Sequence, residues 1–221
     1  SDNTKWKDQL FSNNILINKQ KSELAYIYFA RANILHKEKN YEESSTNLQL
    51  ANQLKLSLKP YKPDALLNRS QALLVESNTK EINQKENDQS PMSIFIVGMP
   101  RSGSTLLESI LSINSNVDDL GEVNLLEESF IEWEKDVKNF TLAELYLKKI
   151  TNSNKLKITT NKWLYNYQYA GIICSQIPNA KVIHCFRNPL DNILSIYRTF
   201  FARGNEYSSS LIDCAKVYLD Q

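Results

Sequence analysis

The chain has few of the residues that build disulfide frameworks and metal centres. It contains 221 residues, of which three are cysteine and two are histidine. Cys174, Cys185 and Cys214 lie in separate segments, without the Cys-x-x-Cys spacing of a zinc site. We therefore expect buried, reduced thiols, a reducing compartment such as the cytoplasm, and no bound metal.

Excess charge and long apolar runs are also absent. Lysine and arginine number 26, against 25 aspartates and glutamates, which gives a net charge of +1. A balanced chain has no general attraction for nucleic acid or for an anionic membrane, so any anion must be held by local donors. No apolar run approaches the ~20 residues of a membrane span. No signal peptide is visible, but the chain starts at Ser1 without methionine, so a preceding targeting segment stays open.

Apolar and small residues recur at helical spacing in residues 1–80. They predict two antiparallel helices that turn at Lys39 and Asn40, with further helical neighbours in residues 4–18 and 61–77. The residues that set the spacing of the pair are Tyr28, Ala32, Leu35, Tyr41, Ser44, Leu48 and Ala51.

This helix pair resembles a tetratricopeptide repeat at its small and aromatic positions. Ser44 stands where alanine is usual, and Leu56 where the closing proline of the repeat is usual. A single repeat rarely stands alone, so it packs on the next domain or belongs to an array that begins upstream. Two interpretations stay open: a surface that binds a protein partner, and a helical brace.

Residues 78–92 are polar and poor in large apolar side chains, which predicts a linker at residues 81–92. Beyond it, expected strands at 93–97, 156–162 and 181–186 alternate with expected helices from Gly103, at 165–177 and at 188–201. This alternation predicts an α/β domain over residues 93–221, with helices flanking a parallel sheet. In such sheets, ligands bind beyond the carboxyl ends of the strands.

Two of the expected helices are amphipathic. The sequence places Leu106, Leu107, Ile110 and Leu111 on one face of the first, and Leu190, Ile193, Leu194, Tyr197 and Phe201 on one face of the other. His184 lies inside an expected strand, and we interpret it as a buried core residue rather than a base.

The loop that joins the first strand to its helix, "GMPRSGST", has the outline of a phosphate-binding loop. Gly98 and Gly103 stand at the spacing of the G-x-x-x-x-G motif. Backbone amides at such a turn and the positive end of the helix bind anions. Arg101 adds a cation, and the hydroxyls of Ser102, Ser104 and Thr105 add hydrogen-bond donors.

The lysine of a nucleoside-triphosphate loop is missing, because Ser104 occupies its position. Without it, the β- and γ-phosphates are not neutralised and nothing obvious holds Mg²⁺. A phosphosulfate carries less charge, and one arginine with several hydroxyls suits it without a metal. "PRSGST" resembles the 5′-phosphosulfate loop of the sulfotransferase family, in the form found in tyrosylprotein sulfotransferases and in bacterial tetratricopeptide-linked sulfotransferases. Ser104 replaces the more usual threonine.

The segment "CFRNPLDNILS" resembles a second motif of that family, which binds the 3′-phosphate of the donor. The motif has an arginine after a strand and a serine eight residues later, and here these are Arg187 and Ser195. Asn188 and Pro189 are typical of a helix start, and an arginine with a helix start favours phosphate binding. The alternatives are a surface salt bridge for Arg187 and a satisfied helix hydroxyl for Ser195.

The reacting groups are predicted from two further segments. In "DDLGEVN", Glu122 follows a glycine near the position of the family's catalytic carboxylate. Tyrosylprotein sulfotransferases have Gly-Glu-Glu there and use the second glutamate, which Val123 replaces, so Glu122 is assigned by a shift of one residue. Asp118 and Asp119 are the reserve candidates, and a solvated loop carboxylate is the alternative for Glu122.

Lys162 matches the lysine of the family's Asp-Lys-x-Pro segment, which implies that it stabilises the leaving phosphate together with Arg101. Asn161 replaces the aspartate of that segment, and Leu164 replaces its proline.

The resemblance implies a sulfotransferase that uses 3′-phosphoadenosine-5′-phosphosulfate, releases 3′,5′-adenosine bisphosphate and needs no metal. Its acceptor is a hydroxyl or amine of a peptide, a glycan or a small molecule. The family's catalytic domain normally extends well beyond the last expected helix, so we expect it to continue past Gln221. Two alternatives stay open: a P-loop nucleotide kinase, and a tetratricopeptide interaction scaffold with an inactive α/β domain.

Overall fold

The computed structural model describes the chain except residues 1, 80–90, 136–138, 151–157 and 203, so the predicted linker lies almost wholly outside the described residues. The described residues form two compact units. One comprises residues 1–63 and 189–219, and the other comprises residues 64–188 and 220–221. These units do not follow the predicted domain boundaries, because residues 64–79 belong with the sheet and residues 189–219 with the N-terminal helices.

The second unit is built on a parallel sheet of four strands in the order β2-β3-β1-β4. They are β1 (Met92–Gly98), β2 (Val117–Asp119), β3 (Ile158–Asn161) and β4 (Ala180–Cys185). The central strand β1 pairs with β3 from Met92↔Ile158 and with β4 up to Gly98↔Cys185. The predicted α/β fold with a preceding helical region is confirmed.

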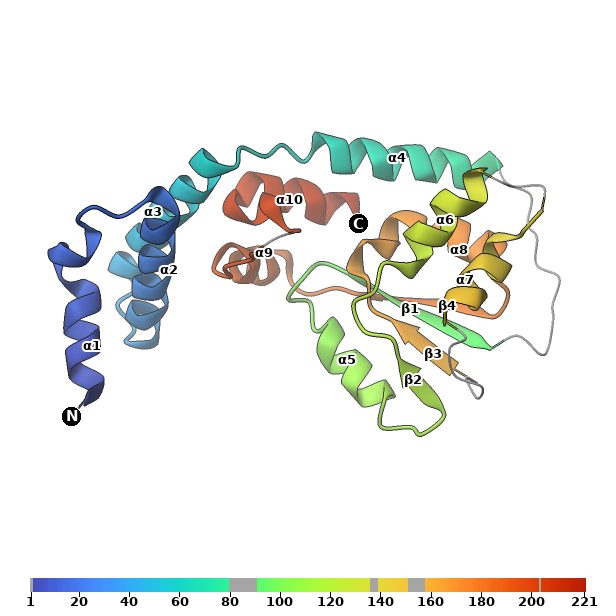
Figure 1. Ribbon diagram of the computed structural model, residues 1–221, viewed down its shortest axis with the longest axis horizontal. Coiled ribbons are helices and arrows are strands. Elements are labelled where there is room, and N and C mark those ends of the chain that lie inside the picture. Colours follow the sequence, from blue (N-terminus) through green and yellow to red (C-terminus); the bar gives the residue numbers. More distant parts are fainter. Residues whose placement is uncertain (1, 80–90, 136–138, 151–157, 203) are drawn as a thin grey trace. The chain divides into compact units, whose positions relative to one another are not determined.

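Helices lie on both faces of this sheet (Figure 1). They are α4 (Asp64–Thr79), α5 (Ser104–Leu111), α6 (Leu125–Lys135), α7 (Leu142–Ile150) and α8 (Ala170–Gln176). The helix expected at 165–177 begins instead as a 3-10 helix, η2 (Leu164–Tyr169), and becomes α8 from Ala170.

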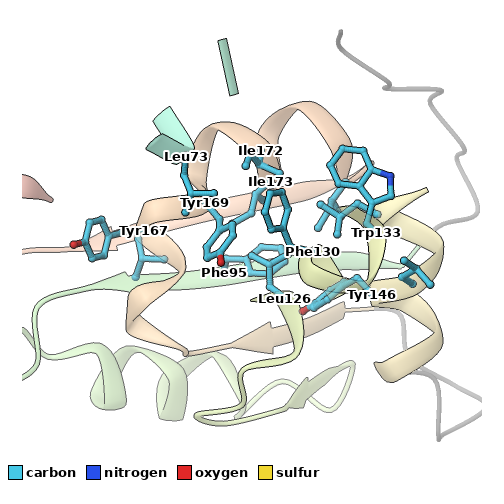
Figure 2. Packing of buried hydrophobic residues seen from close by; sticks show 14 of the residues in the cluster. Leu73, Phe95, Leu126, Phe130, Trp133, Tyr146, Tyr167, Tyr169, Ile172 and Ile173 are labelled. Carbon is cyan, nitrogen blue, oxygen red and sulfur yellow. The ribbon is translucent and has the colours of Figure 1, made fainter. Parts of the chain in front are cut away.

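The main core lies on the face covered by α6, α7 and α8, and Figure 2 shows its side chains. Phe95 of β1 packs on Tyr146 of α7 with ring centroids 5.3 Å apart, and Phe130 of α6 meets Tyr169 edge-on at 5.3 Å. Burial of large aromatic side chains supplies most of the packing energy of such a core. This core fixes the strands from which the candidate site is built.

The apolar faces predicted for two helices are only partly buried. On α5, Leu106 and Ile110 are exposed, whereas Ser104 and Glu108 are buried. On α9 (Pro189–Tyr197), Leu190 and Leu194 are exposed, and Asn192 and Ile196 are buried. We expected apolar residues to mark the buried face, but α5 turns a polar side toward groups that follow the strands, as described below.

The first unit contains α1 (Asp2–Phe11), η1 (Asn13–Leu16), α2 (Lys21–Lys37), α3 (Tyr41–Leu58), α9, η3 (Glu206–Ser209) and α10 (Leu211–Asp220, less its last residue). The turn between α2 and α3 is at the predicted place: Lys39 has a φ of 64°, and the Asn40 side chain caps α3 by accepting from the Glu43 amide. Ser44 Oγ donates to the Ala32 carbonyl at 2.7 Å, so the serine that replaces alanine is satisfied between the helices.

Residues 189–219 pack on this helix pair. Asn52 Nδ2 donates to the Tyr197 carbonyl at 3.1 Å, and Lys55 Nζ donates to the Phe201 carbonyl at 2.8 Å. Phe200 meets Phe29 edge-on with centroids 5.1 Å apart. The helix pair therefore acts as packing for the segment after Arg187, which agrees with the helical brace among the two interpretations.

Two expectations about burial are wrong. His184 is exposed rather than in the core, because β4 is an edge strand. Cys174 is exposed as well, since it falls on the outer side of α8, whereas Cys185 is half-buried and Cys214 buried. All three cysteines are free.

Candidate functional site

The predicted site residues of the second unit follow the carboxyl ends of parallel strands. Gly98 ends β1 and opens the loop to α5, Asp119 ends β2, Asn161 ends β3, and Cys185 ends β4 two residues before Arg187. Because parallel strands end at the same edge of a sheet, these loops gather there. Gly98 is needed for this convergence: a Cβ at its place would collide with the carbonyl group of Cys185.

The backbone of the loop after β1 turns at two residues in the left-handed region. Arg101 and Gly103 both have positive φ, 68° and 105°, which turns the chain sharply into α5. Gly103 is the N-cap of α5 and offers no side chain to cap the first-turn amides of this helix. Ser102 Oγ is buried and makes no hydrogen bond within the described part of the chain. An anion at this helix start would satisfy both sets of donors.

Arg101 is exposed on this loop, Ser102 is half-buried, and Ser104 is buried at the first position of α5. Thr105 is exposed beside it. The loop therefore offers a cation and hydroxyls on consecutive residues around one helix start.

Lys162 and Glu122 are brought together. Lys162 is 4% exposed, and its Nζ lies 2.5 Å from Oε1 of Glu122. The Lys162 amide donates to the Gly121 carbonyl at 3.0 Å, which ties the Glu122 loop to the end of β3. The Glu122 side chain is 64% exposed. The pair thus joins a buried cation to a carboxylate that is exposed to solvent.

Sequence reasoning missed Glu108, which completes this cluster. It is 4% exposed on α5, and its Oε2 lies 3.6 Å from Lys162 Nζ. Burial, then a hydrogen bond and the negative charge of Asp119, raise the pKa of Glu108 to about 7, although Lys162 opposes the shift. The available signal was its place four residues after Ser104, which puts both on one side of α5. The exposed apolar residues of that helix obscured it.

Glu108 links the loop to Lys162. Ser104 and Glu108 are one helical turn apart, about 6 Å along the axis at about 1.5 Å per residue. Since Glu108 lies beside Lys162, the ammonium is about one turn from the start of α5. Two positive charges near this helix start are therefore Arg101 on the loop and the buried Lys162 one turn along.

The hydrogen bonds of Asn161 give a reason why an asparagine replaces the aspartate of the family's Asp-Lys-x-Pro segment. Its Nδ2 donates to the Val123 carbonyl at 3.3 Å, and its Oδ1 accepts from the Trp163 amide and from Asn166 Nδ2, both at 3.1 Å. A carboxylate could accept these bonds but could not donate to Val123. The amide therefore fastens the loop that carries Glu122.

Four further candidates lie outside the Lys162–Glu122 pair. Asp118 is exposed on β2, and Asp119 accepts from the Gly121 amide at 2.6 Å. Arg187 is exposed in the second unit, whereas Ser195 is half-buried on α9 in the first unit. Their joint binding of a phosphate stays a prediction.

No group of three or more potential metal ligands gathers in the part of the chain that the structure describes. Within the same residues, no helix is both long and apolar enough to cross a bilayer.

Comparison with known proteins identifies a family. The model of the sulfotransferase family matches residues 91–154 and 137–221, which include the loop, Glu122, Lys162 and Arg187. An uncharacterised protein of Aquifex aeolicus (strain VF5) is 31% identical over 202 aligned residues, which cover 79% of this chain. The chain spans about a quarter of that relative's length, 26%. No solved structure matches the chain.

The raised pKa of Glu108 predicts how stability depends on pH. The folded protein keeps a proton on Glu108 that the unfolded chain loses above its ordinary pKa of 4.5. The stability that this proton confers is fully present below pH 4.5 and is lost as pH rises through about 7. We expect the free energy of unfolding of the wild type to fall, relative to Glu108→Gln, between pH 5 and pH 8. Urea denaturation of both proteins across this range measures the difference, and parallel pH profiles would contradict the burial of a titrating Glu108.

Proposed function

Because the chain belongs to the sulfotransferase family, we propose that it transfers a sulfuryl group from 3′-phosphoadenosine-5′-phosphosulfate to a hydroxyl or amine of an acceptor. The observation that carries this proposal is the pairing of buried Lys162 with accessible Glu122, about one turn of α5 from the loop after β1. A cation for a leaving phosphate and a carboxylate for an acceptor proton are what the reaction requires.

The phosphosulfate suits this loop because the loop offers hydrogen-bond donors and a cation. The unpartnered Ser102 Oγ and the first-turn amides of α5 would hold the 5′-phosphosulfate, with Gly103, Ser104, Thr105 and the Arg101 guanidinium. Arg187 and Ser195 would hold the 3′-phosphate, as the family motif implies. The donor would supply the activated sulfuryl group.

The chain's own residues would then take a proton from the acceptor and stabilise the negative charge that develops on the leaving phosphate. Glu122 is exposed enough to accept the proton of an acceptor hydroxyl. Lys162 and Arg101 would offset the negative charge that gathers on the phosphate oxygen as the sulfuryl group departs. The roles are complementary: a base that reaches solvent, and a cation held in a site of low dielectric.

Two alternatives remain weaker. A nucleotide kinase needs a lysine in its loop to neutralise a triphosphate, and Ser104, which is buried, stands at that position. An inactive scaffold gives no reason for Lys162 and Glu122, which come from two separate segments that resemble the family's, to lie together.

We propose that the acceptor hydroxyl or amine belongs to a peptide, a glycan or a small molecule. The tetratricopeptide-like helices could select a protein partner, but their packing on residues 189–219 supports bracing as their first role. Free cysteines support the cytoplasm as the compartment.

Nucleotide preference tests the donor assignment. We expect 3′,5′-adenosine bisphosphate to bind more tightly than ATP with Mg²⁺, because the loop lacks the triphosphate lysine. Arg101→Ala should weaken the binding of the bisphosphate by about 10-fold or more, since a charge-assisted hydrogen bond contributes about 1.5–3 kcal/mol. Isothermal titration calorimetry measures both.

The matched control is Lys135→Ala, which removes an exposed cation at the end of α6. It should bind the bisphosphate as the wild type does. Tighter binding of ATP with Mg²⁺, or an Arg101→Ala variant indistinguishable from Lys135→Ala, would remove the proposed donor.

Glu122→Gln tests the base. We expect turnover to fall by about 100-fold or more, because proton transfer to a positioned base contributes about that factor. Affinity for 3′,5′-adenosine bisphosphate should stay nearly unchanged. The assay is sulfuryl transfer from the phosphosulfate donor to a tyrosine-containing peptide, an oligosaccharide and 4-nitrophenol. Asp118→Asn, an exposed carboxylate on β2, is the control; a larger loss in that variant than in Glu122→Gln would move the base to Asp118.

A further inference from the structure

Glu108 is a buried carboxyl group whose bonding is incomplete when it is ionised. It is 4% exposed, and its Oε1 atom makes no hydrogen bond to any residue that the structure describes. Its Oε2 is 3.6 Å from Lys162 Nζ, which gives attraction between charges but is too long for a hydrogen bond. Because a desolvated charge is costly, buried carboxylates normally have their oxygens satisfied.

The charged groups that face Glu108 come from two strand ends. Asp119 at the end of β2 is close enough to share a hydrogen bond, and Lys162 follows β3. The Lys162 ammonium also contacts Glu122, at 2.5 Å. Two carboxyl groups thus lie close to this ammonium and a third, that of Asp119, lies beside Glu108, so a proton on Glu108 lowers the excess of negative charge. The proton also lets Glu108 donate a hydrogen bond, which the Asp119 carboxylate can accept.

The same face of α5 carries Ser104, one turn nearer the start of the helix. An anion held by the first-turn amides therefore lies about one helical turn from Glu108. Negative charge so close, in a buried setting, favours the neutral form of Glu108 further. Binding of the anion and protonation of Glu108 are then coupled.

We propose that Glu108 is a positioning residue that takes up a proton when an anionic nucleotide binds the loop after β1, and so frees Lys162 to turn from Glu108 to the nucleotide's phosphate. The proposal rests on the proposed function, since it needs that loop to bind the nucleotide. Ionised Glu108 competes with the phosphate for the ammonium, whereas protonated Glu108 does not. Because protonation of Glu108 removes this competition, nucleotide binding would become stronger as the pH falls through neutrality.

Proton uptake on binding tests the coupling without turnover. Calorimetry of 3′,5′-adenosine bisphosphate in two buffers of different ionisation enthalpy gives the number of protons taken up. At pH 7.5 we expect the wild type to take up roughly half a proton more per nucleotide than Glu108→Gln, and this difference should vanish at pH 5.5. The phosphates of the nucleotide also titrate, near pH 6, but equally with both proteins.

A second variant keeps the test valid if Glu108→Gln does not fold. Asp119→Asn retains an oxygen for the Gly121 amide but removes the negative charge beside Glu108. Its proton uptake should reach a maximum at a lower pH than in the wild type, because the pKa of Glu108 falls when that charge is lost.

The outcomes separate the two proposals. Tight binding of the bisphosphate with equal proton uptake in the wild type and Glu108→Gln overturns the role of Glu108 and leaves the proposed function standing. An Asp119→Asn variant whose maximum uptake stays at the wild-type pH overturns the role of Glu108 in the same way. Failure of the wild type to bind the bisphosphate overturns both.

Discussion

The burial of Lys162 is the constraint on which the candidate site depends. An ammonium that is 4% exposed loses its hydration, and the Glu122 carboxylate at 2.5 Å offsets that loss. Lys162 directly follows β3, its backbone hydrogen bond to Gly121 holds the loop that carries Glu122, and α5 places Glu108 beside the same ammonium. The sheet, the loop after β1 and the amide of Asn161 are therefore best understood as the support that keeps one cation near the start of a helix.

Much of the fold could be predicted, because it depends on local patterns. Strands at 93–97 and 181–186 were predicted within one residue of β1 and β4, since buried apolar runs bounded by turn residues are strong signals. The buried sides of α5 and α9 were predicted less well. Amphipathicity indicates which residues share a face, but only tertiary packing decides that Glu108 and Asn192 are buried while Leu106 and Leu190 are exposed.

The site could be predicted in its motifs but not in its pairings. Family resemblance pointed to Glu122 and Lys162, and the structure shows that they touch. Glu108 carried no motif, because its significance comes from Asp119 and Lys162, which are distant in the sequence and meet it only through the parallel strands. Asn161 departs from the family's aspartate, yet its amide makes a bond that a carboxylate could not donate.

The most direct test of the proposed site is a crystal structure of the protein with 3′,5′-adenosine bisphosphate. We expect a phosphate at the start of α5, within hydrogen-bond distance of Ser102 Oγ, with Lys162 Nζ turned toward it. A nucleotide bound away from that helix start, or a Lys162 side chain that still points only at Glu122 and Glu108, would contradict the proposed site.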